Sequence, residues 1–237
     1  MGESVVNERG MASIASQTLP IPPSQATKMA LARITVLISG RGSNLAALID
    51  AVDAGTIDGA VTQVISNRSH AAGLAYAERN GIAATVVDHR AYASRAAFDA
   101  ALAEAIDRSE PNLIVFAGFM RILGADFIAR YAGRMLNIHP SLLPAYPGTD
   151  THRRALDDRV PRHGCTVHFV TTDVDGGPIV AQAEVPVMPD DDAQSLAARV
   201  LEAEHRLLPQ VVGWFCAGRI VLEDGRARII DAPTVSR

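Results

Sequence analysis

Apolar positions follow two alternating periods from residue 33 onward. Short apolar runs typical of buried strands alternate with segments in which apolar residues recur every three or four positions, as in amphipathic helices. The predicted strands are Ile34–Ile38, Val61–Ser66, Ala84–Val87, Leu113–Ala117 and Arg134–Ile138, and the predicted helices are Asn44–Asp53, Ala71–Asn80 (closed by Gly81), Arg95–Arg108 and Ala125–Tyr131. This order predicts an α/β fold with a doubly wound, mostly parallel open sheet of the Rossmann-like type.

The pattern changes after residue 160. The predicted elements there are the strands Cys165–Val170 and Ile179–Val187, a long helix over Ala193–Ala217 and a C-terminal hairpin formed by Arg219–Glu223 and Ala227–Ile230. Asp190 to Asp192 precede the long helix, where carboxylates suit the positive end of the helix dipole. Asp224-Gly225 predicts a type I′ turn in the hairpin.

The first 32 residues differ from the rest of the chain. They are rich in Ser, Gln, Thr and Pro and sustain neither period. They lack the continuous apolar stretch of a secretory signal, and Glu3 and Glu8 are unusual in a mitochondrial transit peptide. We expect a flexible tail over residues 1–32 and a single catalytic domain over residues 33–237.

Composition narrows the class of protein. The 237 residues are 48% hydrophobic and 20% charged, with a formal net charge of −4 and scattered basic residues, so neither a disordered chain nor a nucleic-acid-binding protein is expected. No apolar run approaches the ~20 residues that a membrane-spanning helix needs. Two cysteines, Cys165 and Cys216, are too few for a secreted disulfide scaffold, so we expect a cytoplasmic, soluble protein.

Four unusual segments directly follow predicted strands. They are Ser39–Asn44, Gly118–Arg121, Asn137–Ser141 and Thr171–Gly177. In an open α/β sheet, ligands bind beyond the carboxyl ends of the parallel strands, where loops and helix N-termini meet. We therefore expect all four segments along one edge of the sheet.

The first segment, Ser39-Gly40-Arg41-Gly42-Ser43-Asn44, fits a phosphate site. Its glycines separate a strand from a helix that Ser43 and Asn44 can cap, which leaves backbone N–H groups free for an anion. A dinucleotide site is less suited, because Leu45 stands where the third glycine belongs and no acid follows the second strand. A plain tight turn that needs glycine is the alternative without a ligand.

His139 and Asn137 emerge together at the end of a predicted strand, and Asp175 lies in the later loop that ends in Gly176-Gly177-Pro178. A carboxylate beside the imidazole would stabilise its protonated form. The three side chains therefore form a candidate proton-transfer site, although a single histidine is often structural.

Other types of site fit these residues less well. Ser141 lacks the G-x-S-x-G elbow of a nucleophilic serine. A calcium loop from Asp173 to Glu184 would have Pro178 where a glycine is needed. A metal site from His163, Cys165 and His168 would need ligands from both sides of one strand.

Glu204 interrupts an apolar stripe on the long helix, which steps through Ala197, Leu201, Leu208, Val211 and Phe215. Two interpretations stay open. The carboxylate either forms a partly buried ion pair with Arg199 or Arg206, or binds a substrate amine.

The motifs together resemble the phosphoribosylglycinamide formyltransferase family, the folate-dependent formyltransferases of purine synthesis. The resemblance rests on Leu37–Leu45, Ala117–Leu123, Asn137–Pro144, Val167–Val170 and Asp175–Pro178, and it covers roughly Ile34 to Ala217 in unbroken order. It implies the formyltransferase fold and formyl transfer from the co-substrate 10-formyltetrahydrofolate to the amine of N1-(5-phospho-β-D-ribosyl)glycinamide, without a metal.

The resemblance also implies roles for individual residues. Catalysis is assigned to His139, Asn137 and Asp175, phosphate binding to Gly42, Ser43 and Asn44, glycinamide binding to Glu204, and folate binding to Arg95, Met120, Arg121, Ile122, Leu123, Asn137, Thr171, Thr172, Asp173, Val174 and Asp175. The implied partners are small-molecule substrates, with no nucleic acid and no membrane, and the protein would be a monomer or a homodimer.

Related activities remain as alternatives. Methionyl-tRNA formyltransferases carry a C-terminal nucleic-acid-binding domain, for which the residues after the long helix are too few. Formyltetrahydrofolate hydrolases use water as the acceptor and carry an N-terminal regulatory domain, for which the tail is too short. A non-catalytic nucleotide or folate binder is the third alternative, and intact Asn137, His139 and Asp175 argue against it.

Overall fold

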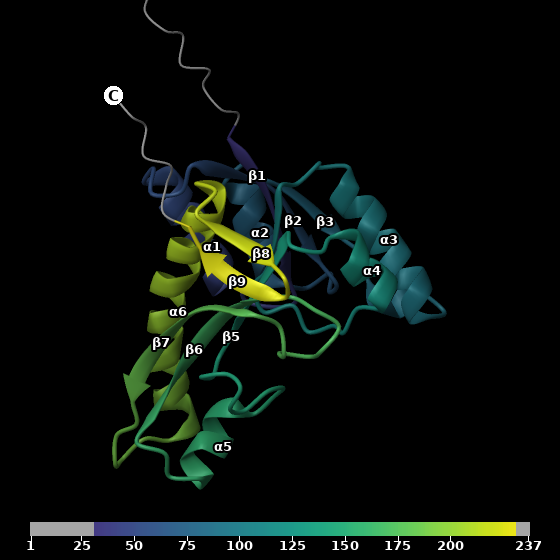
Figure 1. Cartoon of the computed structure of the whole chain (residues 1–237). Helices are drawn as coiled ribbons and strands as arrows, with labels where there is room; N and C mark the ends of the chain where they lie inside the picture. Colours follow the sequence, from purple (N-terminus) through teal and green to yellow (C-terminus); the bar gives the residue numbers. More distant parts are fainter. Residues whose placement is uncertain (1–30, 231–237) are drawn as a thin grey trace, which may run out of the picture. The chain divides into compact units, whose positions relative to one another are not determined.

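The computed structural model describes residues 31–230, so nearly all of the predicted tail lies outside the described part of the chain. Seven strands form one sheet in the order β3-β2-β1-β4-β5-β6-β7 (Figure 1). The strands are β1 (Ala32–Ile38), β2 (Gly59–Ser66), β3 (Ala83–Val86), β4 (Leu113–Phe116), β5 (Met135–His139), β6 (Arg162–Phe169) and β7 (Ile179–Pro186). Strands β1 to β5 are parallel, whereas β6 and β7 are antiparallel to their neighbours.

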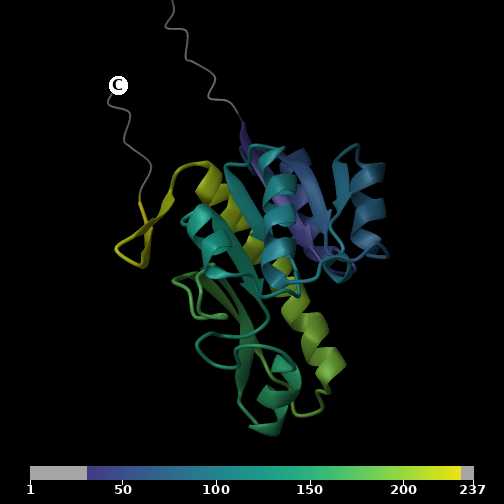
Figure 2. The same ribbon diagram turned by 90° about the vertical axis from the view of Figure 1, so that its right-hand side faces the viewer.

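Helices cover both faces of the sheet (Figures 1 and 2). They are α1 (Ser43–Asp53), α2 (Ala72–Arg79), α3 (Arg95–Asp107), α4 (Ala125–Arg130), α5 (Thr151–Asp157) and α6 (Ala193–Cys216), with a 3₁₀ turn at His89–Ala91. Because successive strand residues point to opposite faces, β4 divides its side chains between two cores: Leu113 and Val115 pack with α1, α2 and α6, and Ile114 and Phe116 pack with α3 and α4. The predicted doubly wound, mostly parallel sheet is confirmed.

The C-terminal elements also follow the prediction. Helix α6 begins with a capping box, in which Asp192 accepts from the backbone N–H groups of Gln194 and Ser195. After it, β8 (Ile220–Glu223) and β9 (Arg226–Ile229) form the hairpin. Asp224 and Gly225 both have positive φ, at 49° and 70°, as a type I′ turn requires.

Most predicted boundaries agree with the structure to within three residues, and β1 begins at Ala32 rather than Ile34. The sequence analysis missed α5, which has no sustained apolar period, and the short 3₁₀ turn at His89–Ala91. None of the helices within residues 31–230 is long and apolar enough to cross a membrane.

Candidate active site

Strand β5 supplies the first two site residues. Asn137 and His139 are two positions apart, so their side chains point to the same side of the sheet. The parallel neighbour β4 and the antiparallel neighbour β6 flank β5, and Asn137 stands opposite both Phe116 and His168. His139 is buried and Asn137 is half-buried, so β5 holds both groups at the end of a rigid strand.

Both ring nitrogens of His139 face hydrogen-bond acceptors. Nδ1 lies 3.4 Å from Oδ2 of Asp175, and Nε2 lies 2.9 Å from the backbone oxygen of Tyr146. An imidazole that carries a proton on each nitrogen satisfies both neighbours, whereas a neutral ring leaves one acceptor without a donor. The geometry therefore directs both ring nitrogens at acceptors, and the one at Nδ1 is the Asp175 carboxylate that the sequence predicts as its partner.

Asp175 is held by a backbone hydrogen bond and lies near a second histidine without bonding to it. Its Oδ2 accepts a hydrogen bond of 2.8 Å from the backbone N–H of Gly148, and its Oδ1 lies 3.8 Å from Nε2 of His168. The residue itself has a φ of 53°, in the left-handed region that Asp and Asn tolerate better than most side chains.

The loop that carries Asp175 reaches the site by a route that the sequence analysis did not foresee. Because β6 is antiparallel to β5, Thr171–Gly177 begins near the N-terminal end of β5 and not at the shared carboxyl edge. The expectation that all four segments follow one edge is therefore wrong for this one. The loop folds back tightly at Gly177, where a Cβ would lie 1.9 Å from the backbone oxygen of Phe169, and Asp175 returns toward His139.

His168 is a site residue that the chemical argument missed. Its Nδ1 donates to the backbone oxygen of Phe169 at 2.9 Å, so Nε2 is free to accept the 3.0 Å hydrogen bond from Nδ2 of Asn137. Burial lowers the pKa of His168, which keeps the ring neutral and fixes this tautomer. Asn137 is thereby oriented, with its second amide hydrogen left for a ligand. The register between β5 and β6, which places His168 opposite Asn137, reveals this contact, and sequence alone does not provide that register.

The loop before α1 is built by close backbone contact. Gly42 has a φ of 79°, and a Cβ there would lie 2.7 Å from Cα of Gly73 in α2. The predicted caps are wrong: Gly42 is the N-cap, and neither Ser43 nor Asn44 caps the first turn with its side chain. The first backbone N–H groups of α1 lack side-chain partners, which is the arrangement that binds an anion.

Asn44 instead contacts Glu204, which lies 160 residues later in the chain. Nδ2 of Asn44 donates to Oε2 of Glu204 at 2.7 Å, while Oδ1 of Asn44 is buried without a partner among residues 31–230. Burial raises the pKa of Glu204, and the hydrogen bond from Asn44 offsets part of this.

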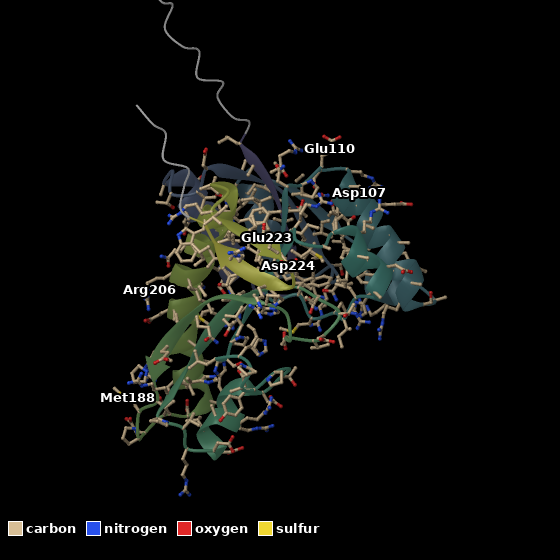
Figure 3. All side chains as sticks on the ribbon, viewed as in Figure 1. Asp107, Glu110, Met188, Arg206, Glu223 and Asp224 are labelled. Carbon is tan, nitrogen blue, oxygen red and sulfur yellow. The ribbon has the colours of Figure 1, made fainter. Side chains whose placement is uncertain are left out.

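The ion-pair interpretation of Glu204 is wrong. Arg199 pairs with Asp191 at 2.6 Å, and Arg206 is exposed at the outside of α6 (Figure 3). The described residues therefore supply no cation to the Glu204 carboxylate. The interpretation that remains is a carboxylate available to a ligand.

Apolar side chains are exposed in the loops that follow β4 and β6. Met120, Ile122 and Val174 are 63%, 55% and 54% exposed, an unusual state for such side chains, whereas Leu123 is buried in the core with α3 and α4. Arg121, Thr172 and Asp173 are exposed as well, and Thr171 is half-buried. The two loops therefore offer a mixed apolar and polar surface, to which Leu123 can contribute only its backbone.

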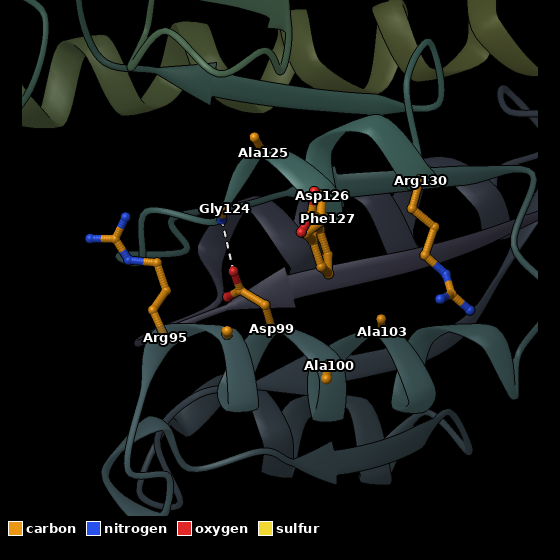
Figure 4. A pocket seen from close by; sticks show the side chains of 10 residues that line it. Arg95, Asp99, Ala100, Ala103, Gly124, Ala125, Asp126, Phe127 and Arg130 are labelled. Carbon is orange, nitrogen blue, oxygen red and sulfur yellow. Dashed lines mark hydrogen bonds between the residues drawn. The ribbon is translucent and has the colours of Figure 1, made fainter.

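Arg95 is not joined to the catalytic residues. It begins α3 after the N-cap Ser94 and lines a groove of about 630 Å³ between α3 and α4, with Asp99 and Arg130 (Figure 4). Asn137, His139 and Asp175 do not line this groove. The link to the other predicted folate residues is Gly124, which directly follows Leu123 and donates to Asp99 at 2.7 Å.

Comparisons with known proteins decide the family. The formyl transferase model matches residues 32–212. The chain belongs to the formyl transferase family. It is 49% identical over 194 residues to the phosphoribosylglycinamide formyltransferase of Escherichia coli strain K12, covering 82% of this chain and 92% of that protein.

Solved structures agree with this assignment. The glycinamide ribonucleotide transformylase 1 of Symbiobacterium toebii superposes with a TM-score of 0.82 at 48% identity, covering 85% of this chain and 95% of that one. A formyltetrahydrofolate deformylase from Pseudomonas syringae has a TM-score of 0.79 at 23% identity, over 86% of this chain and 67% of that one, and shows the shared fold alone.

The serine-nucleophile, calcium-loop and metal-site interpretations of these residues do not fit the geometry. Ser141 is fully buried and donates its hydroxyl to the backbone oxygen of Ala145 at 2.6 Å, so it is not a nucleophile. Glu184, which a calcium loop would use, pairs with Arg162. Within residues 31–230, no group of three or more His, Cys, Asp or Glu side chains could hold a metal ion.

Proposed function

We propose that the protein transfers the formyl group of 10-formyltetrahydrofolate to the amine of N1-(5-phospho-β-D-ribosyl)glycinamide, a step of purine biosynthesis. The observation that carries this proposal is the grouping of Asn137, His139 and Asp175 at the end of β5. The family membership and the 49% identity to the E. coli enzyme support the same reaction.

The chemistry requires stabilisation of an oxyanion. When the amine attacks the formyl carbon, negative charge develops on the formyl oxygen, and hydrogen-bond donors aimed there lower the barrier. The free amide hydrogen of Asn137 is suited to this task. An N–H at Nε2 of His139 can join it once the formyl oxygen replaces the backbone oxygen of Tyr146 as the acceptor. Asp175 orients the ring, and His139 can pass that proton toward the departing folate nitrogen, which is a poor leaving group until it is protonated.

The ribotide would bind through two different kinds of group. The unpaired N–H groups at Gly42, Ser43 and Asn44 suit its phosphate. Glu204, held by Asn44 at 2.7 Å, suits the glycinamide amine, because its carboxylate can accept hydrogen bonds and a proton from it. The raised pKa of Glu204 is consistent with a buried carboxyl group whose charged form a cationic ligand would stabilise.

The folate would lie along the exposed apolar side chains of Met120, Ile122 and Val174. Backbone groups of Arg121, Leu123 and Thr171–Asp173 would bind its polar edge. Arg95, at the end of the groove between α3 and α4, would reach only a distant part of the molecule, such as its carboxylate tail.

We also propose that the partners are small molecules and that the protein works as a monomer or a homodimer in a reducing, cytoplasmic environment. The free cysteines Cys165 and Cys216 and the net charge of −4 support this.

The test is a spectrophotometric assay with a 10-formyl folate, run with and without the ribosylglycinamide phosphate. We expect release of the deformylated folate only when the acceptor is present. The variant His139→Asn should lose this release, whereas His70→Asn, on the exposed loop after β2, should keep it. Release that ignores the acceptor would mean hydrolysis, and no release with folded protein would contradict the proposal.

A further inference from the structure

The hydroxyl of Ser39 lies between the two loops that the proposed function assigns to different substrates. Ser39 directly follows β1 and begins the loop that leads to Gly42. Its Oγ accepts a hydrogen bond of 2.8 Å from the backbone N–H of Met120, the first residue of the exposed apolar loop after β4. Ser39 is only 5% exposed, so water competes little for this contact.

A second contact fixes the direction of that hydroxyl. Oγ of Ser39 donates to Oδ1 of Asn67 at 2.5 Å, and Asn67, at the end of β2, is 1% exposed. Asn67 is held in turn by one hydrogen bond with His89, whose Nδ1 lies 3.1 Å from its Nδ2 and 3.0 Å from its backbone oxygen and bonds one of them according to its tautomer. Because Asn67 takes the hydroxyl proton, the oxygen lone pair of Ser39 faces Met120.

We propose that Ser39 is a positioning residue. Its hydroxyl sets the place of the Met120 loop (Met120–Leu123) relative to the anion loop that Ser39 itself begins (Ser39–Asn44), and Asn67 acts through Ser39. This inference rests on the proposed function, since it assigns the formyl folate to the Met120 loop and the ribotide phosphate to the anion loop. Strands β1 and β4 are paired as far as Leu37 and Phe116, and the N–H of Ala117 donates to the oxygen of Leu37 at 2.9 Å. The hydroxyl of Ser39 continues this connection one step further along both segments.

The geometry distinguishes this role from direct catalysis. Both hydrogen-bonding directions of the Ser39 hydroxyl are used by protein groups, so it has no proton left for a substrate. Removal of the hydroxyl leaves the N–H of Met120 without its acceptor and allows the loop to shift. The loss should therefore appear in binding of the formyl folate and not in the chemical step or in binding of the ribotide.

The experiment compares Ser39→Ala with Thr35→Val. Thr35 lies on β1, the strand that Ser39 follows, is fully buried, and shares a hydrogen bond of 2.6 Å with Ser109, which keeps a further bond to Ile106. Both changes delete one buried hydroxyl, but only Ser39 contacts a loop that the proposed function assigns to a substrate. We expect Ser39→Ala to raise KM for the formyl folate about tenfold, with kcat and the ribotide KM within about threefold, whereas Thr35→Val leaves all three near wild type.

Two substitutions at Asn67 test its hydrogen bond with the hydroxyl of Ser39. Asn67→Asp keeps an acceptor for the Ser39 hydroxyl and should stay within about threefold of wild type, while Asn67→Leu removes it and should match Ser39→Ala. The double variant Ser39→Ala/Asn67→Leu should be no worse than either single variant, because both break the same connection.

The outcomes separate this inference from the proposed function. Equal KM values for the formyl folate in Ser39→Ala and Thr35→Val would overturn the positioning role, as would additive losses in the double variant. If wild type shows no transfer but binds tetrahydrofolate in calorimetry, the proposed function fails, and the ratio of Kd values for Ser39→Ala and Thr35→Val then decides the inference alone.

Discussion

The two halves of the site are built in different ways. The loop before α1 (Ser39–Asn44) depends on main-chain contact, because a Cβ at Gly42 would lie 2.7 Å from Cα of Gly73. The half around His139 depends on side chains and on backbone strain. Three non-glycine residues there, Tyr146, Asp150 and Asp175, have positive φ.

The difference indicates what each half must do. A phosphate keeps its charge throughout the reaction, so fixed N–H groups at a helix N-terminus suffice to bind it. Around the formyl group, charge and protons move, and side chains that can exchange protons are needed. Substitutions should therefore act mainly on ribotide binding in the first half and mainly on kcat in the second.

The largest effect should come from Asp175→Asn. Asn tolerates the left-handed backbone at this position, so the fold is kept, but the negative charge 3.4 Å from Nδ1 of His139 is lost. We expect kcat to fall about 10²- to 10³-fold, with the ribotide KM nearly unchanged, in steady-state assays. Asp224→Asn, which has a similar φ of 49° in the exposed hairpin turn, serves as the control and should be silent.

Gly42→Ala should give the next largest effect, on the other half. The new Cβ would lie 2.7 Å from Cα of Gly73, so the anion loop must shift, and we expect a ribotide KM about tenfold or more higher and a stability loss of about 3 kcal/mol. Gly55→Ala is the matched control, because Gly55 has a φ of 71° but open space around it. It should lose only about 1 kcal/mol in urea denaturation and keep its KM. Similar losses in both variants would refute the role of close contact.

Glu204→Gln tests the carboxylate that accepts the hydrogen bond from Asn44, in the half of the site around the anion loop. The amide cannot take a proton from the glycinamide amine, so the ribotide KM should rise about tenfold. Burial raises the pKa of Glu204 in the fold, so wild-type stability declines as pH rises above the unfolded value of 4.5, and the neutral amide avoids this decline. The free energy of unfolding of the Glu204→Gln protein at pH 7 should therefore exceed that of wild type by about 1 kcal/mol in chemical denaturation.

The exposed Glu202 on the same helix supplies the comparison for this experiment. Glu202→Gln should change neither the ribotide KM nor the pH dependence of stability. A Glu204→Gln protein that is less stable than wild type at pH 7 would contradict the account given for the buried carboxylate.

The smallest effect on activity at neutral pH should come from a substitution of His163, which lies against Tyr146 in the half of the site around His139. Its ring contacts Tyr146 and His152 edge-on, neither of its nitrogens has a partner within residues 31–230, and burial lowers its pKa to about 4. The unfolded chain, with a pKa near 6.5, takes up the proton first, so stability is complete above pH 6.5 and declines toward pH 4. His163→Leu should remove about 2 to 3 kcal/mol of this decline.

The measurement is the free energy of unfolding in urea at several pH values between 4 and 7. The exposed His70 provides the control, since His70→Leu should leave the slope unchanged. A slope that is the same in wild type and His163→Leu would exclude this histidine as the source.

Sequence patterns predicted the elements whose periods are strong. Strand β4 is a continuous apolar run, and β1 is apolar from Ile34 to Ile38 apart from Thr35; these residues are buried on both faces, and such runs are easy to recognise. Helix α5 escaped because Thr151–Asp157 buries only Thr151 and Ala155, which is too little for a periodic signal. The antiparallel direction of β6 escaped because strand direction depends on the length and course of the preceding loop and not on the strand's own residues.

The candidate site shows the same division. Asn137, His139 and Asp175 could be chosen from residue type and from their places after strands, and the structure brings them together. The backbone oxygen of Tyr146, the acceptor from His139, carries no signal in residue type. Ser39 escaped because its importance depends on one hydrogen bond to a loop 81 residues away.

The contact between Asn44 and Glu204 also has a consequence for the time at which the protein can first bind its ligand. The two residues are separated by 160 positions, so the ribosome completes the anion loop long before it adds the carboxylate. At roughly 5–20 residues per second, the interval is on the order of 10 to 30 s. During that interval the amide of Asn44 lacks the carboxylate partner that it has in the fold. Both groups can therefore contact one ligand only after α6 has been synthesised.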